Sequence, residues 1–304
     1  MSKTFKSGFV ALIGRPNVGK STVINQILGR KISIISKKPQ TTRNQIRGIY
    51  TTEEEQIIFI DTPGIHKPQH ELGNYMNKES ISTLSDVDLI LLIIDGTRNY
   101  GKGDEFVLEL LKKMNTPVFL VVNKIDLIKN KNRLLENVVH FQKNFPFKET
   151  FYISALQGDN VDLLLENISN QLEAGPKYYP ENQVSDCPEV FIIAEIIREK
   201  VLTLTEQEVP HSVAVVVEEM EKDEVNPDLL NIRATIYVER PSQKKIIIGS
   251  EGTMIKEIGT QARKDIVKIV GQKVYLELWV KVEENWRNKK TQLRRMGYFF
   301  EEQK

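Results

Sequence analysis

The residues best suited to chemistry form a glycine-bearing loop near the start of the chain. They match the pattern G-x-x-x-x-G-K-[ST] between an apolar run at residues 9–13 and a helix-like segment at residues 22–29. Backbone N–H groups of such a loop, with the start of the following helix, form a concavity that binds anions. The loop therefore predicts a nucleoside triphosphate site, in which Lys20 reaches the β- and γ-phosphates and Ser21 binds Mg²⁺. The phosphate-binding set comprises Gly14, Arg15, Pro16, Asn17, Val18, Gly19, Lys20, Ser21 and Thr22.

Two further stretches, each after an apolar run, predict which base is bound. Asn123, Lys124 and Asp126 follow residues 118–122. The Asp126 carboxylate can accept both the N1–H and the exocyclic amino group of guanine, whereas adenine would leave this charged acceptor unpaired. Guanine is therefore the expected base, and an ATP-using kinase is disfavoured. The second stretch is Ser154-Ala155-Leu156, which follows the apolar run at residues 150–153. The backbone N–H of Ala155 can donate a hydrogen bond to the guanine O6.

A third stretch, Asp61-Thr62-Pro63-Gly64, follows the apolar run at residues 57–60. Asp61 can hold Mg²⁺ through a water molecule, and the N–H of Gly64 can face the γ-phosphate. The next residue, Ile65, has no group that could hold an attacking water by a hydrogen bond. His66 and His70 are four residues apart, but Pro68 between them disfavours a helical metal site.

The elements that position these residues follow from an alternation of apolar and amphipathic segments. Near-continuous apolar strands separated by helices predict a doubly wound, mostly parallel sheet in an α/β domain. The runs at residues 46–51 and 57–60 have no helix between them and predict one antiparallel pair. The remaining predicted strands are 9–13, 89–94, 118–122 and 150–153, and the predicted helices are 75–85, 104–115, 131–145 and 161–173.

The pattern changes after a stretch of glycine, proline and polar residues at 175–188, which is a linker by composition. Residues 189–304 then read as an α+β domain. A helix-like run covers 189–204, strands are expected at 212–218, 232–239 and 273–282, and helical segments lie before the last strand. We therefore predict a nucleotide-binding domain at 1–174, a linker at 175–188 and a second domain at 189–304.

Charge is distributed unevenly in the second half, although the whole chain carries a formal net charge of only +1. Residues 181–239 hold four Lys/Arg against fourteen Asp/Glu, and residues 240–295 hold fourteen against six. The basic part contains a G-x-x-G loop, whose two glycines would let a nucleic-acid backbone approach closely. It predicts phosphate binding, with a solvated basic surface as the alternative. The candidate RNA-binding residues are Lys244, Lys245, Ile248, Gly249, Ser250, Glu251, Gly252, Arg287, Lys289 and Lys290.

Bulk properties exclude several classes of protein. The one cysteine, Cys187, cannot form an internal disulfide, and the longest apolar runs are far shorter than the roughly 18 residues that a membrane span needs. We expect a cytoplasmic monomer. Because the basic C-terminal stretch ends in aromatic residues, weak peripheral contact with the inner face of the cell membrane stays open.

The motifs of the first domain resemble those of the translation-factor-related GTPases. The resemblance implies a switch set of Gln40, Thr41, Thr42, Arg43, Asp61, Thr62, Pro63, Gly64 and Ile65. It also implies that Thr42, or alternatively Thr41, joins Ser21 and Asp61 on Mg²⁺ when GTP is bound. Ras-like enzymes place a glutamine where this chain has Ile65. Slow intrinsic hydrolysis is therefore expected, with Asn17 helping to bind K⁺ as a compensating charge.

In the second domain, the G-x-x-G loop between helices in an α-β-β-α-α-β order resembles a type II KH domain, which clamps single-stranded nucleic acid. A GTPase followed by a KH domain resembles the Era family of bacterial GTPases over nearly the full length. The resemblance implies GTP-dependent binding to the 3′ end of 16S ribosomal RNA and to the immature 30S particle. Two alternatives stay open: a GTPase acting on tRNA or another RNA, and a protein-binding switch whose KH-like domain does not bind RNA.

Overall fold

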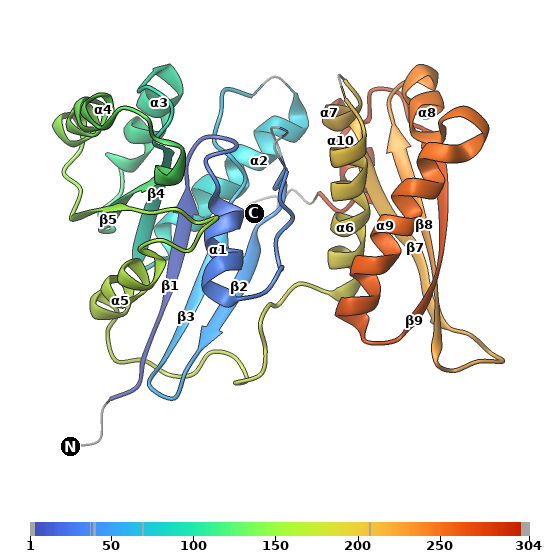
Figure 1. The fold of residues 1–304 in the computed structure, drawn as a ribbon, viewed down its shortest axis with the longest axis horizontal. Coiled ribbons are helices and arrows are strands. Elements are labelled where there is room, and N and C mark those ends of the chain that lie inside the picture. Colours follow the sequence, from blue (N-terminus) through green and yellow to red (C-terminus); the bar gives the residue numbers. More distant parts are fainter. Residues whose placement is uncertain (1–3, 37, 39–40, 69, 207, 299–304) are drawn as a thin grey trace. The chain divides into compact units, whose positions relative to one another are not determined.

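A computed structural model of the protein describes residues 4–36, 38, 41–68, 70–206 and 208–298. The chain divides into two compact units that meet in sequence at Asp186 and Cys187, with short stretches at 36–39 and 70–75 grouped with the second. Each unit has its own sheet, of six and three strands respectively (Figure 1). None of the helices in the described ranges combines the length and hydropathy needed to cross a membrane.

The first unit is built on a six-stranded sheet in the order β2-β3-β1-β4-β5-β6. All neighbouring pairs are parallel except β2 and β3, so the predicted fold class with one antiparallel pair is confirmed. The strands begin and end within three residues of the predicted positions. Their bounds are β1 Lys6–Ile13, β2 Ile46–Thr51, β3 Glu55–Asp61, β4 Leu89–Asp95, β5 Val118–Asn123 and β6 Glu149–Tyr152.

Helices cover both faces of this sheet, which explains why the central strands are apolar throughout. Residues of α1 and α5 pack into the core on one face, and residues of α3 and α4 pack into the core on the other. All seven residues of β4 are buried. The helix bounds are α1 Lys20–Leu28, α2 Glu71–Ser82, α3 Lys102–Leu111, α4 Lys131–Asn144 and α5 Val161–Gln171.

The segment predicted as a linker follows a hydrogen-bonded path along the first unit up to Asp186. The fully buried side-chain oxygen of Gln56 accepts the backbone N–H groups of Tyr178 and Tyr179, at 2.7 and 2.9 Å. Further along, the N–H of Ile49 donates to the carbonyl of Val184 at 2.8 Å. The edge strand β2 therefore gains a backbone hydrogen bond from the segment that composition predicts to be a linker.

The second unit places helices on a three-stranded sheet in the order β7-β8-β9, in which β7 and β8 are antiparallel and β8 and β9 parallel. The core of this unit includes Ile258, Ala262 and Ile266, which recur at helical spacing and are all fully buried. A four-residue helix at Val209–Ser212 was not predicted. The bounds are α6 Glu189–Leu204, α7 Val209–Ser212, β7 Ala214–Lys222, β8 Leu229–Val238, α8 Pro241–Ile248, α9 Thr253–Val270, β9 Lys273–Val282 and α10 Lys290–Arg295.

Candidate nucleotide and RNA sites

The glycine-bearing loop lies between the end of β1 and the start of α1, as the motif requires. Gly14 has φ +148°, and a Cβ there would lie 2.3 Å from the carbonyl oxygen of Ile93. Gly19 has φ +101°, and a Cβ there would lie 2.3 Å from the side-chain nitrogen of Asn123. Both positions therefore need glycine for the close approach of neighbouring strands as well as for backbone conformation.

Lys20 is buried at the first position of α1, and its ammonium lies 3.4 Å from the carbonyl oxygens of Gly14 and Arg15. Burial lowers the pKa of Lys20 to about 8, and the nearby carboxylate of Asp61 opposes this shift. A buried cation held by long contacts to carbonyls is poorly compensated. Phosphate oxygens in the loop would compensate it fully, which suits Lys20 to the role predicted for it.

Three predicted Mg²⁺ ligands meet in one cluster. The Oγ of Ser21 donates to Oδ2 of Asp61 at 2.6 Å and lies 3.0 Å from Oγ1 of Thr42. The hydroxyl of Thr42 also lies 3.4 Å from Oδ2 of Asp61, so Thr42 is part of this cluster. Ser33, which the sequence did not single out, donates to Oδ2 as well, at 2.7 Å. Gln40 lies outside the described residues.

This cluster fits a magnesium ion. Its donors are hydroxyl and carboxylate oxygens, the ligands that Mg²⁺ prefers. Asp61 is fully buried, and its Oδ1 has no hydrogen-bond partner within the described part of the chain. Burial raises the pKa of Asp61, against the lowering effects of Lys20 and the three hydroxyls. A cation beside Oδ1 would satisfy the orphaned oxygen and stabilise the ionised carboxylate.

The stretch after Asp61 packs against the phosphate loop. A Cβ on Gly64 would lie 2.8 Å from the Cα of Pro16, and the N–H of Ile65 donates to the carbonyl of Gly14 at 3.1 Å. The Ile65 side chain is fully buried in the core, so it offers nothing to an attacking water. Thr62 donates to the carbonyl of Leu12 at 2.7 Å and serves the fold.

Residues of α2, missed by the sequence analysis, hold the next part of this loop. The side-chain amide of Asn77 donates to the carbonyl of His66 at 2.7 Å, and the hydroxyl of Ser80 donates to the carbonyl of Pro63 at 2.9 Å. His66 Nδ1 lies 3.0 Å from the carbonyl of Gly64. Among the described residues, no group of three His, Cys, Asp or Glu side chains is arranged to bind a metal ion.

The predicted base-recognition residues come together beside the phosphate loop. Asn123 donates from Nδ2 to the carbonyl of Val18 at 2.9 Å, and its Oδ1 accepts the N–H of Ala155 at 3.0 Å. The N–H that the sequence assigned to guanine O6 therefore also orients Asn123. Asp126 is exposed and accepts from the Ser154 hydroxyl through Oδ1 at 2.6 Å. Leu156 follows at 72% exposure.

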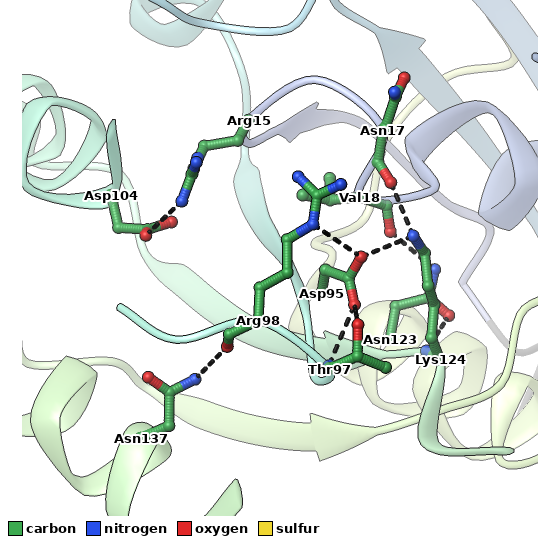
Figure 2. Close-up of polar contacts among 10 residues, drawn as sticks. All are labelled: Arg15, Asn17, Val18, Asp95, Thr97, Arg98, Asp104, Asn123, Lys124 and Asn137. Carbon is green, nitrogen blue, oxygen red and sulfur yellow. Dashed lines mark hydrogen bonds and ion pairs between the residues drawn. The ribbon is translucent and has the colours of Figure 1, made fainter. Parts of the chain in front are cut away.

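Lys124 links the base-recognition residues to two other elements. Its ammonium donates to the carbonyl of Asn17 at 2.8 Å and to Oδ2 of Asp95 at 2.6 Å (Figure 2). In the same view the side chain of Asn17 points away from Lys124 and Asp95. The phosphate loop also contacts α3, because Arg15 forms an ion pair with Asp104 at 3.0 Å. Asp95 and Asp104 were not predicted as site residues.

In the second unit, the G-x-x-G loop joins α8 to α9. Gly249 and Gly252 have φ values of +75° and +78°, and Glu251 between them also has a positive φ of +51°. Three residues of four thus adopt a backbone conformation that is costly for ordinary side chains. Gly249 and Gly252 adopt it at little cost, so of these three residues only Glu251 is strained. Lys245 is exposed and Lys244 half-exposed on α8, and Ile248 ends that helix.

The basic C-terminal residues divide into two kinds. Arg287 donates from Nε at 3.0 Å and from Nη2 at 2.5 Å to the same oxygen of Glu239, so it joins two segments of the unit. Lys289 and Lys290 are exposed. Trp286 is fully buried and donates to the carbonyl of Ser212 at 2.9 Å, whereas Trp279 on β9 is 53% exposed.

Comparisons with known proteins match a different family model to each unit of the chain. A family model described as a 50S ribosome-binding GTPase matches residues 9–124, and a KH domain model matches residues 208–287. A crystal structure of a tyrosine-to-alanine variant of Aquifex aeolicus Era bound to GDP and AlF4⁻ is 42% identical in sequence. It covers 97% of this chain and 100% of its own, with a TM-score of 0.93.

A second similar structure is that of Era in complex with MgGDPNP and nucleotides 1506–1542 of 16S ribosomal RNA. It is also 42% identical over 97% of this chain and 100% of its own, with a TM-score of 0.94. Identity at this level over almost the whole length includes both units. The predicted resemblance is therefore confirmed, and this chain belongs to the Era family of GTPases.

Proposed function

We propose that this protein is a GTP-hydrolysing switch that binds the 3′ end of 16S ribosomal RNA through its second unit. The observation that carries the proposal is that one chain joins a full set of guanine-nucleotide residues to a KH domain whose G-x-x-G loop follows Lys244 and Lys245. A relative 42% identical over 97% of this chain was solved with an RNA of this kind.

In the first unit, each residue has a defined task. The loop N–H groups and Lys20 hold the phosphates, and Asp126 selects guanine through two donors on the base edge. Ser21, Thr42 and Asp61 would hold Mg²⁺, directly or through water, and the bound ion would neutralise charge that develops on the β- and γ-phosphates. Ile65 leaves the attacking water without a side-chain partner, so intrinsic hydrolysis is expected to be slow.

K⁺ is proposed as a further cofactor. Asn17 has a positive φ of +66°, and its backbone carbonyl is occupied by Lys124 while its side chain points away from that contact. The amide oxygen of Asn17 is a suitable ligand for an alkali cation. We expect GTP turnover to be faster in K⁺ than in Na⁺ at equal ionic strength. An Asn17→Ala variant that retained the K⁺ response would contradict this assignment.

We further infer that the RNA is met within the immature 30S particle, that the protein acts in the cytoplasm, and that it works as a monomer. These steps rest on the family and on the distribution of basic residues in the second unit. Co-sedimentation with 30S particles, compared with co-sedimentation with anionic lipid vesicles, separates ribosomal attachment from contact between the basic C-terminal stretch and a membrane.

The decisive experiment is crosslinking followed by sequencing of the bound RNA, with the protein loaded with a non-hydrolysable GTP analogue or with GDP. Enrichment of the 16S 3′ end in the GTP state is the expected result. Equal RNA retention in both nucleotide states would remove the switch, because a ligand shifts an equilibrium only through differential affinity. Enrichment of tRNA would favour the first alternative, and absence of RNA would favour a protein-binding switch.

A further inference from the structure

The last residue of β4, Asp95, is a buried carboxylate that none of the nucleotide motifs includes. Only 6% of it is exposed, and it lies opposite Asn123 at the end of the neighbouring parallel strand β5. The carboxyl ends of parallel strands form the edge at which nucleotides bind in sheets of this kind. A charged side chain buried at that edge needs a specific reason, because burial without partners is costly.

The partners of Asp95 are arranged in a defined way (Figure 2). Its Oδ1 accepts the N–H of Thr97 at 3.0 Å and the Thr97 hydroxyl at 2.6 Å, which fixes the orientation of the carboxylate. Its Oδ2 accepts from the ammonium of Lys124 at 2.6 Å and lies 3.5 Å from Nε of Arg98. Burial raises the pKa of Asp95, but the hydrogen bonds from Lys124 and Thr97 outweigh it and bring the pKa below its ordinary value.

Lys124, in turn, needs an anchor. Its backbone has φ +67° and ψ +36°, a left-handed conformation that is unfavourable for a residue with a side chain. Such a conformation persists where surrounding contacts over-determine it. Here the ammonium is held at two points, by Asp95 and by the carbonyl of Asn17 in the phosphate loop.

We propose that Asp95 is a positioning residue of the nucleotide site, which clamps Lys124 so that the base-recognition loop and the phosphate loop keep their mutual placement. The inference rests on the proposed nucleotide function of the first unit and adds a residue to it. Because Asp95 acts on the side of the site that receives the base, it stabilises bound GDP and GTP equally. Its effect reaches the phosphate loop only through Lys124, which holds the carbonyl of Asn17.

The test compares Asp95→Asn, at the last residue of β4, with Asp88→Asn, at the residue directly before β4. Asn keeps an oxygen for Thr97 but loses the negative charge and presents an N–H group toward the ammonium of Lys124. Asp88 is exposed, and its side chain accepts the N–H of Phe9 at 2.7 Å, so it serves as a carboxylate control away from Lys124. Dissociation of fluorescent GDP and of a fluorescent GTP analogue is measured by stopped flow for each variant.

For Asp95→Asn we expect both nucleotides to dissociate about tenfold faster, which corresponds to the loss of one charge-assisted hydrogen bond. Asp88→Asn is expected to dissociate as the wild type does. Thr97→Ala, which removes only one bond to the carboxylate, should give a change in the same direction of about two- to threefold. It serves as the readout if Asp95→Asn does not fold.

A double-mutant cycle with Lys124→Met identifies the route of the effect. If Asp95 acts through Lys124, adding Asp95→Asn to Lys124→Met leaves the dissociation rate where Lys124→Met alone puts it. Full additivity of the two changes, or wild-type dissociation from both Asp95→Asn and Thr97→Ala, would overturn the proposal. A wild-type protein that bound no guanine nucleotide would instead overturn the proposed function, so the two failures are distinguishable.

Discussion

The two glycine-bearing loops that precede α1 and α9 are built in opposite ways. The loop before α1 is enclosed, because the loop and the first turn of α1 bond residues of β3, β5 and the segment before β2 through buried or partly buried hydrogen bonds. The loop between α8 and α9 is exposed and depends on backbone conformation and nearby lysines. The first geometry can identify one nucleotide atom by atom. The second can grip a phosphate backbone of almost any sequence.

The largest effect is expected where the enclosed site identifies its ligand. Asp126→Asn replaces a carboxylate that would accept two guanine donors by an amide that can accept only one. GTP affinity should fall on the order of 100-fold, while ATP affinity stays as weak as before, so that discrimination between the bases shrinks. Competition of GTP and ATP against fluorescent GDP measures both affinities.

Asp126 also accepts from Ser154, so a control must separate base recognition from loop geometry. Ser154→Ala removes that hydrogen bond and keeps the carboxylate. We expect Ser154→Ala to weaken GTP binding only several-fold and to preserve the preference for guanine. Equal losses of preference in the two variants would indicate that the enclosed site selects its base by shape and not by the carboxylate.

The next effect concerns the exposed loop. Gly252→Asp places a negative charge and a side chain where an RNA backbone is proposed to approach, and retention of single-stranded RNA should fall more than about tenfold at low salt. GTP binding should not change. A filter-binding titration of a 16S 3′-end oligonucleotide measures the loss.

Gly271 at the end of α9 offers a matched control. It has φ +70° against +78° at Gly252, and no atom would lie within 4 Å of a new Cβ at either position. Gly271→Asp therefore carries the same charge and similar backbone strain at the other end of the same helix. If both variants lost RNA equally, general electrostatics or lost stability would explain the effect, and the clamp would be wrong. Gly249 is less suitable, since a Cβ there would lie 2.7 Å from Cβ of Met254.

The contrast between the two loops also explains how far the sequence could predict them. The strands β4 and β5 are buried on both faces, so their apolar runs revealed the sheet, and the polar residues that follow them revealed the edge. Asp95 escaped because it directly ends an apolar run and matches no motif. Only the register that places it opposite Asn123 brings out its role.

Segments with mixed composition were harder to predict. The stretch after Gly175 reads as a linker by composition, but two of its N–H groups bond the buried side chain of Gln56, more than a hundred residues earlier. Arg287 reads as part of a basic patch, but Glu239 lies against it in space. Long-range partners of this kind leave no periodic signal in a sequence, whereas the burial of a helix face or a strand does.

A smaller effect follows from the buried ammonium in the enclosed loop. The pKa of Lys20 is about 8 without phosphate, and phosphate oxygens would raise it. Nucleotide binding should therefore take up a proton near pH 8, and affinity should fall about fourfold between pH 7 and pH 8.5 as the free protein loses that proton. Calorimetric titrations in two buffers of different ionisation enthalpy measure the proton uptake.

The same lysine has the opposite effect on folding. An unfolded chain holds this proton up to a pKa of 10.5, so the nucleotide-free fold should become more stable as the pH rises from about 8 toward 10.5. Lys20→Arg cannot deprotonate in this range and should bind more weakly but without the pH trend. A trend retained in Lys20→Arg would assign it to another group.

The smallest effect separates phosphate contact from structure within the exposed basic region. Lys289 is exposed, and its replacement by alanine should weaken RNA binding about two- to threefold for any sequence and reduce the slope of log K against log salt by about 0.7.

Arg287→Ala instead removes the ion pair with Glu239, so its main effect should be a lower melting temperature. Lys143→Ala, at an exposed position of helix α4 in the first unit, should change neither quantity. If Lys289→Ala left the salt slope unchanged while Arg287→Ala reduced it without loss of stability, the paired arginine would be the phosphate contact. The basic C-terminal region would then contact phosphate through an ion-paired side chain held by the fold, as the enclosed loop does through the buried Lys20.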